Sequence, residues 1–275
     1  MKKKYSDLTT EDRKTIIDFY YKHKEIKVGD MNRYLNVSKR TLRQVLVDAG
    51  INTKLKNRYV IQNENYFENI DTEFKAYILG FIYADGFVGD HDDFCFGLSD
   101  KCEDNYKLLN YFKEELGTNL NVLQTKTQDG YGHYIFKFSN KKIVSDLNKL
   151  GVFPRKSLNM TYFPNIPEQY MNHFIRGYFD GDGSIFTYYD SYDKRKRYCM
   201  EILGTPDFLE QMQLAICNCC NVKHTRLHDV KRIPGLTRIA YKGINSLVKI
   251  REYLYKNATY YLTYKHDRFY NIQPL

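Results

Sequence analysis

Hydrophobic and polar positions follow helical spacing through the first 50 residues of this chain. Apolar side chains return every three or four positions there, which is typical of helices that bury one face. Ser38 has the side chain of an N-cap, and Gly50 follows the last apolar position as a stop. The pattern predicts three helices, over 9–24, 29–35 and 38–50. The polar stretch 52–69 that follows them predicts a linker.

After this stretch, helical and alternating patterns occur in one order that is used twice. Each copy opens with an apolar helix. The first copy continues with hairpins at 87–99 and 120–139 and helices at 100–117 and 140–151. The second continues with hairpins at 184–204 and 224–242 and helices at 206–221 and 244–256. The sequence therefore predicts the α+β class, with two pseudo-symmetric αββαββα half-domains preceded by a small all-α domain.

The two opening helices share a pattern of small residues that ends on an aspartate and a glycine. They are YILGFIYADGFV at 77–88 and FIRGYFDGDGSI at 174–185. Alignment places Gly80 with Gly177, Ala84 with Gly181, Asp85 with Asp182 and Gly86 with Gly183. Small residues four apart lie on one face of a helix, so these two helices can pack almost backbone to backbone. Parallel packing would bring Asp85 and Asp182 together.

Two neighbouring carboxylates at helix C-termini are electrostatically unfavourable in a bare protein, because like charges and the helix dipole both oppose them. A cation would relieve this. Oxygen ligands from Asp85 and Asp182, with the carbonyls of Ala84 and Gly181, suit Mg²⁺ (or Mn²⁺) better than a soft metal. The following glycines are expected to be left-handed C-caps. The alternative is a pair of core helices that end in solvent-exposed aspartates, and two copies in register favour the metal site.

Both segments resemble the signature helix of the LAGLIDADG homing endonucleases, at 78–86 and 175–183. The first copy departs from the family pattern at Tyr83, where the family often has an acid, but the later acid, Asp85, is present. The resemblance spans about residues 60–270. Two copies in one chain imply the monomeric, pseudo-symmetric form of the family.

The resemblance implies a site-specific double-strand DNA endonuclease that hydrolyses one phosphodiester bond per aspartate with divalent metal. It implies a long asymmetric target, cleavage across the minor groove and short 3′ overhangs. It also places a basic residue beside each active site, at Lys156 and Lys265, and polar residues that arrange solvent near Asp100 and Thr205.

In this family the antiparallel strands form a saddle along the DNA groove. A basic run lies at the expected tip of a hairpin in the second copy, at Lys194, Arg195, Lys196 and Arg197. We expect this run to contact phosphates rather than bases, since a charged hairpin tip more often meets the backbone. A solvated turn is the alternative.

The N-terminal helices resemble a helix-turn-helix module. Polar side chains of the third helix lie off its apolar face and could meet phosphates and major-groove base edges: Lys39, Arg40, Arg43 and Gln44. The alternative is an ordinary three-helix bundle with a solvated basic face. The expected domains are the helix-turn-helix module over 1–58, a linker over 59–72, and half-domains over 73–165 and 166–275.

Charge agrees with a polyanionic partner. The formal net charge is +9, and residues 1–58 hold 15 Lys and Arg against 7 Asp and Glu. Residues 151–275 are also basic, with 18 against 11, whereas 59–150 are acidic, with 9 against 15. A DNA-binding half-domain in the acidic middle would need a basic face that net charge does not reveal.

Other features bear on location. No apolar run is long enough to span a membrane, and the basic start lacks a signal peptide's apolar stretch. The six cysteines have no disulfide-framework spacing, which fits a reducing compartment. Cys217 and Cys220 lie too close to His224 and His228 for the usual zinc finger, so core and surface thiols are expected. These features predict an intracellular protein, cytoplasmic (bacterial or phage-encoded) or organellar.

Two other functions are compatible with part of this pattern. A maturase or repressor of the same fold could bind nucleic acid without cleaving it, although loss of cleavage usually begins at the acids, and both are present. A transcriptional regulator built on the N-terminal module would not need the duplicated Asp-Gly helix ends. The chain shows no intein splicing residues at its ends, so we expect a freestanding or intron-encoded protein.

Overall fold

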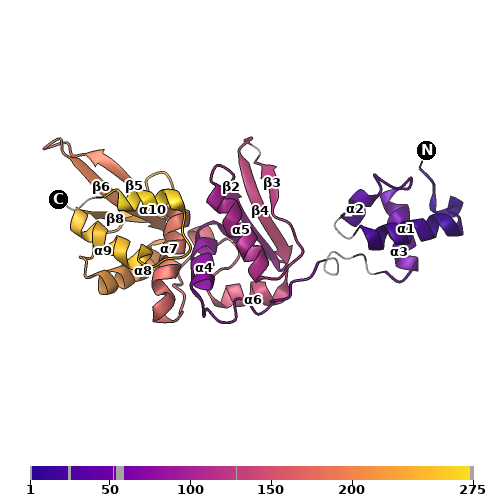
Figure 1. The fold of residues 1–275 in the computed structure, drawn as a ribbon, viewed down its shortest axis with the longest axis horizontal. Coiled ribbons are helices and arrows are strands. Elements are labelled where there is room, and N and C mark those ends of the chain that lie inside the picture. The colour runs from indigo at the N-terminus through magenta and orange to yellow at the C-terminus, as the bar shows by residue number, and fades with distance from the viewer. Residues whose placement is uncertain (1, 24–25, 52, 54–58, 128, 273–275) are drawn as a thin grey trace. The chain divides into compact units, whose positions relative to one another are not determined.

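The structure is a computed structural model, and it describes residues 2–23, 26–51, 53, 59–127 and 129–272. The chain forms two compact units (Figure 1). The first, here the N-terminal unit, contains residues 1–62 and 117–120, and the second, here the two-sheet unit, contains 63–116 and 121–275.

The N-terminal unit is helical. A 3-10 turn, η1 (Tyr5–Asp7), precedes α1 (Thr10–Lys22), α2 (Val28–Met31) and α3 (Lys39–Asp48). These helices confirm the three predicted ones, although α1 and α3 are shorter at both ends and α2 begins one residue earlier and ends four residues earlier than predicted. Thr9 and Asp12 form a capping box at the start of α1, and the Ser38 side chain accepts a hydrogen bond from the Thr41 amide (3.0 Å) at the start of α3. The apolar helix faces form one core, which includes Ile16, Met31 and Leu42.

The two-sheet unit contains the predicted αββαββα order twice, which confirms the α+β fold class. The first half has α4 (Glu73–Asp85), β1 (Gly86–Val88), β2 (Asp93–Ser99), α5 (Glu103–Glu115), β3 (Leu123–Lys126), β4 (Gly132–Ser139) and α6 (Lys141–Lys149). The second has α7 (Met171–Asp182), β5 (Gly183–Tyr189), β6 (Lys196–Gly204), α8 (Pro206–Cys220), β7 (His228–Asp229), β8 (Thr237–Lys242) and α9 (Ile244–Tyr255). The sheets have the equivalent orders β1-β2-β4-β3 and β5-β6-β8-β7, and every pair of strands is antiparallel.

α4 and α7 pack side by side where the two halves meet (Figure 1). Their glycines make the contact. A Cβ atom at Gly80 would lie 2.0 Å from the Phe174 carbonyl oxygen, and one at Gly177 would lie 1.9 Å from that of Tyr77. No side chain fits between backbones this close, so only glycine permits this approach.

The glycines after the two aspartates do not adopt the left-handed conformation that the sequence predicted. Gly86 has φ −76° and Gly183 has φ −87°, so both are extended and begin β1 and β5 directly. Glycine is required there for space, because a Cβ atom would lie 2.6 Å from the Ile82 side chain or 2.1 Å from that of Phe179. Each helix therefore continues into a strand without a loop.

Residues 63–72 pack within the two-sheet unit, in a stretch where the sequence predicted a linker. Tyr66 and Phe67 are fully buried, and both rings contact Phe112 on α5. The N-cap of α4 is Thr72, whose side chain accepts a hydrogen bond from the Lys75 amide (3.2 Å). The predicted linker residues 54–58 lie outside the described residues.

Besides η1, three short elements were not predicted. The 3-10 turns η3 (Lys156–Leu158) and η4 (Glu168–Tyr170) lie between the halves in sequence, and α10 (Thr263–Tyr270) follows α9. α10 packs against β5 and α9. Leu262, Lys265 and Phe269 are buried at helical spacing, a pattern that could have revealed this helix.

Candidate active site

Asp85 and Asp182 are the last residues of α4 and α7, so the packing of these helices decides where their carboxylates lie. α4 and α7 are also in close contact at their C-terminal ends. A Cβ atom at Gly181 would lie 2.3 Å from the Ala84 Cβ and 3.2 Å from Oδ2 of Asp85. The carboxylate of one helix therefore lies against the last turn of the other.

Both carboxylates are reachable by solvent, since Asp85 is exposed and Asp182 is half-buried. The surrounding protein atoms nevertheless displace much of their water. This burial and the charge of Asp182 both raise the pKa of Asp85, Lys156 and Lys265 oppose the shift, and the pKa reaches about 6. Burial also raises the pKa of Asp182. Two acids whose ionised forms are disfavoured in one place are typical of a site completed by a cation.

Each half adds one buried lysine at its helix end. Lys156 Nζ donates to the carbonyl oxygens of Tyr83 (2.7 Å) and Ala84 (3.2 Å). Lys265 Nζ donates to the carbonyl oxygens of Phe179, Asp180 and Gly183 (each 2.7 Å) and of Gly181 (3.4 Å). These carbonyls form the negative ends of α4 and α7, where a cation is favoured. The ammonium groups thus take the place of a left-handed glycine cap.

Burial lowers the pKa of both ammonium groups, while the aspartates oppose the change. The pKa of Lys265 falls to about 8. Each half therefore brings one acid and one base of perturbed pKa to a single place, the junction between a core helix and the first strand of its sheet.

The donor set fits a hard divalent cation in part. Two carboxylates are present, and the Ala84 and Gly181 carbonyls already accept from lysines, but each carbonyl oxygen has two lone pairs and these contacts are the longest that each lysine makes. Among the described residues no group of three or more His, Cys, Asp and Glu side chains could hold a metal. A cation here would need water or substrate oxygens as its remaining ligands.

A buried polar network supports the second lysine, and no motif in the sequence indicates it. Asp180 accepts hydrogen bonds from the hydroxyls of Tyr77 (2.8 Å) and Tyr255 (2.7 Å) and from the Leu262 amide (2.9 Å). Leu262 is the N-cap of α10, so Asp180 fixes the start of the helix that positions Lys265. The only sequence signal was an acid in an otherwise apolar stretch.

Arg176 is fully buried beside this network, with its guanidinium over the Tyr77 ring (5.2 Å). Its guanidinium donates to Glu73 Oε1 and to the Leu254 and Tyr260 carbonyl oxygens, each at 2.8 Å. These bonds connect α7 to the start of α4, to the end of α9 and to the chain after α9.

The two polar residues expected to arrange solvent are engaged elsewhere. The Asp100 carboxylate accepts from Gln124 Nε2 (3.1 Å) on β3. The Thr205 hydroxyl donates to the Met160 carbonyl oxygen and is buried. The structure gives neither side chain a contact with Asp85 or Asp182.

The basic run of the second half lies where the β5–β6 hairpin turns and β6 begins. All four side chains are exposed: Lys194, Arg195, Lys196 and Arg197. Arg197 pairs with Asp193 (2.5 Å), and Lys196 lies over the Tyr198 ring. Further along the same sheet face, Arg238 pairs with Glu201 (2.9 Å), and Lys242 lies over Tyr188.

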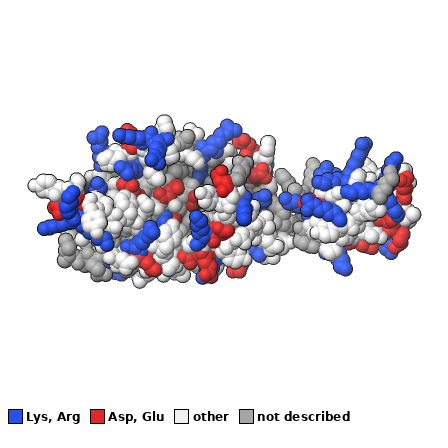
Figure 2. All heavy atoms as spheres, turned by 90° about the horizontal axis from the view of Figure 1, so that it is seen from above, with Lys and Arg blue, Asp and Glu red and all other residues white. Residues whose placement is uncertain are grey.

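In the N-terminal unit, the predicted DNA-binding residues share the exposed side of α3: Lys39, Arg40, Arg43 and Gln44. Its opposite side is buried through Leu42, Val45 and Leu46. Lys and Arg side chains are spread over the face of this unit that Figure 2 shows.

No helix in the described part of the chain is both long and apolar enough to cross a bilayer.

The chain is similar over most of its length to solved structures of LAGLIDADG proteins. The LAGLIDADG meganuclease I-AabMI bound to uncleaved DNA is 11% identical, with 74% of this chain and 89% of that one covered and a TM-score of 0.49. The homing endonuclease I-GzeII in complex with its DNA target is 12% identical, with 73% and 88% covered and a TM-score of 0.47. The N-terminal LAGLIDADG domain of DUF199/WhiA is 15% identical, with 70% and 89% covered and a TM-score of 0.43. No protein-family model and no curated protein matches the sequence.

Proposed function

We propose that this chain is a site-specific double-strand DNA endonuclease of the homing type that depends on a divalent cation. One observation is central. Asp85 and Asp182 end two helices in backbone contact, and each helix end also holds a buried lysine. Two equivalent sets of acid and base suit two equivalent reactions, one on each strand of a duplex.

A divalent cation, Mg²⁺ or Mn²⁺, held by Asp85 and Asp182 with the Ala84 and Gly181 carbonyls, would supply the Lewis acid for phosphodiester hydrolysis. The chain's own residues prepare the site. Backbone packing fixes the two carboxylates, since the glycine contact leaves the helices no room to slide. Lys156 and Lys265 place positive charge beside them, where negative charge develops on a phosphate under attack.

The proposed partner is double-stranded DNA with a long asymmetric target, bound by a monomer. The two sheets supply an extended surface, and the cations of the β5–β6 hairpin are suited to phosphates. We assign the N-terminal unit to DNA as a helix-turn-helix module, with α3 as its reading helix. An intracellular location, cytoplasmic or organellar, follows from such a substrate.

The test is cleavage of a plasmid library with randomised inserts, with and without Mg²⁺. The wild-type chain should linearise a subset of plasmids only with the cation. Asp85→Asn and Asp182→Asn should each abolish double-strand cleavage while binding stays near the wild-type level, because Lys and Arg contacts to phosphate provide most of the affinity.

Asp129→Asn, at an exposed hairpin tip, is the matched control and should cut normally. Wild-type rates of double-strand cutting by either active-site variant would overturn the assignment. Binding without cleavage by the wild-type chain would instead indicate a maturase or regulator of the same fold.

A further inference from the structure

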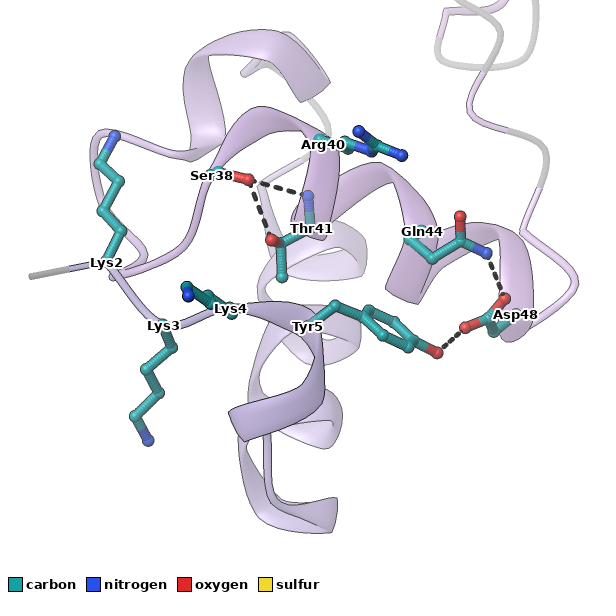
Figure 3. Close-up of a pocket in the computed structure, with 9 residues that line it drawn as sticks. All are labelled: Lys2, Lys3, Lys4, Tyr5, Ser38, Arg40, Thr41, Gln44 and Asp48. Carbon is teal, nitrogen blue, oxygen red and sulfur yellow. Dashed lines mark hydrogen bonds between the residues drawn. The ribbon is translucent and has the colours of Figure 1, made fainter.

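The first residues of the N-terminal unit lie along its third helix. Lys3 forms a parallel bridge with Val37, and its amide donates to the Asn36 carbonyl oxygen (2.9 Å). The segment 2–5, here the arm, is thereby held beside the start of α3. Arm and helix together line an open groove of about 570 Å³ (Figure 3).

The groove is basic. Lys2 and Lys4 of the arm and Arg40 of α3 line it and are exposed. Within the described residues, neither Lys4 nor Arg40 forms an ion pair. Lys3 differs, because its ammonium is bound to both carboxylate oxygens of Asp12 (2.7 and 2.8 Å). Exposed cations from two segments that line one groove are suited to the phosphates of a nucleic-acid backbone.

The one carboxylate of the groove is already engaged. Asp48 accepts a hydrogen bond from the Tyr5 hydroxyl and another from Gln44 Nε2 (2.8 Å). Figure 3 shows the Asp48 carboxylate between Tyr5 of the arm and Gln44 of α3, with a hydrogen bond to each. The bond to Asp48 fixes the orientation of the Gln44 amide, which keeps its oxygen and its second N–H for another partner. A glutamine with a free acceptor and donor matches the edge of adenine in the major groove.

We propose that the arm and α3 form one surface that reads duplex DNA. Lys2, Lys4 and Arg40 contact backbone phosphates along the groove, and Gln44 contacts a neighbouring base edge. Tyr5 and Asp48 are positioning residues: Tyr5 holds the Asp48 carboxylate, which in turn fixes the orientation of the Gln44 amide. This inference deepens the proposed DNA binding of the N-terminal unit and does not depend on cleavage by the two-sheet unit.

The phosphate contact is tested through the salt dependence of binding. The full chain is titrated with a random-sequence 30-base-pair duplex across a salt series, and Lys2→Ala/Lys4→Ala is compared with Lys14→Ala/Lys22→Ala. The control variant removes the same charge from exposed positions of α1 outside the groove. The plot of log K against log salt has a negative slope. Loss of one or two phosphate contacts should make this slope shallower by about 1 to 2 for the arm variant alone.

The base contact is tested by selection of bound duplexes from a random pool. Gln44→Ala should reduce preference at one base position about tenfold. Tyr5→Phe should weaken preference at that same position by about threefold, with overall affinity retained. Tyr21→Phe, at an exposed tyrosine of α1, should leave it unchanged. A merely structural role for Tyr5 would lower affinity for all sequences alike.

Melting curves check that each variant folds. Equal slopes for the two double-lysine variants, or a Tyr5→Phe profile identical to wild type, would overturn the proposal. So would an arm variant that loses affinity for an RNA hairpin but not for duplex DNA. Cleavage by the same preparations is scored separately, so failure of the nuclease assignment and failure of the arm are distinguishable.

Discussion

The two halves of the two-sheet unit repeat one order of elements but complete their sites differently. In the first half, Lys156 comes from a 3-10 turn and contacts two carbonyl oxygens, and Tyr83 occupies the motif position equivalent to Asp180. In the second half, Lys265 comes from an additional helix and contacts four. The duplicated motif therefore fixes the acids symmetrically, while the parts that hold the bases have diverged.

The sheet faces differ as well. By strand register, the face away from the helices in the second sheet includes Arg197, Arg238 and Lys242, whereas among the described residues of the equivalent face in the first sheet Lys137 is the only Lys or Arg. The lysine of the second half thus makes more hydrogen bonds, and the outer face of the second sheet carries more Lys and Arg. We expect the second half to tolerate fewer changes and to provide more of the phosphate contacts.

The largest effect should come from the contact that the halves share. Gly80→Leu or Gly177→Leu would force a side chain into backbone atoms and should lower the free energy of unfolding by about 3 kcal/mol or more. Thermal melting measures this. Gly29→Ala is the control, because a Cβ atom at Gly29 has no neighbour within 4 Å. Normal melting of both leucine variants would show that the helices do not meet there.

The next effect separates the halves. Arg176 and Leu79 occupy equivalent motif positions, and both are fully buried. Arg176→Leu removes the cation that pairs with Glu73 and leaves two carbonyl oxygens without its hydrogen bonds, and it should cost about 3 kcal/mol of stability. Leu79→Met keeps the volume and should cost less than about 1.5 kcal/mol. Equal losses in denaturant unfolding would mean that the second half is not the more tightly held.

Substitution of the two lysines tests whether each site cleaves one strand. Lys156→Met and Lys265→Met should each slow cutting of one strand by about 100-fold, because each removes one fixed positive charge. Gel analysis with separately labelled strands should show nicked duplexes, with opposite strands intact in the two variants. If both variants spare the same strand, the lysines do not serve separate sites.

The smallest effect is a pH dependence of stability in the metal-free chain. The pKa of Asp85 is raised to about 6, so the folded state holds its proton more tightly than the unfolded state does. Stability from this group is present below about pH 4 and is lost as pH rises through about 6. Asp85→Asn should therefore raise the melting temperature at pH 7 and not at pH 4. An equal change at both values would contradict this origin.

A second pH effect has the opposite sense. The pKa of Lys265 is lowered to about 8, so its contribution to stability is present above about pH 10.5 and is lost as pH falls through about 8. Lys265→Met should remove this loss. Melting of wild type and variant between pH 7 and 10.5 measures the difference, and parallel curves would contradict it.

Local patterns were enough to predict the order of elements in both halves, because helix and strand periods are written in short stretches of sequence. The close approach at Gly80 and Gly177 was also readable, since small residues four apart define a helix face. The roles of Asp85 and Asp182 in catalysis remain predictions.

Features that depend on distant residues were not readable. Gly86 and Gly183 are extended, and lysines from distant segments donate to the carbonyl oxygens at the two helix ends. The polar residues around Tyr66 and Phe67 predict a linker, because the burial of these two rings depends on Phe112, far along the chain. Asp180 was not identified, since its partners come from α4, α9 and the residue before α10.

The direct passage from helix to strand has a mechanical consequence. Each aspartate connects a helix anchored in the core directly to a strand of an exposed sheet. No loop separates the helix from the strand. A molecule that binds the sheet and twists it would therefore also move the carboxylate, because the glycine contact holds the neighbouring helix in place. The twist of each sheet thus sets the position of the aspartate that precedes it.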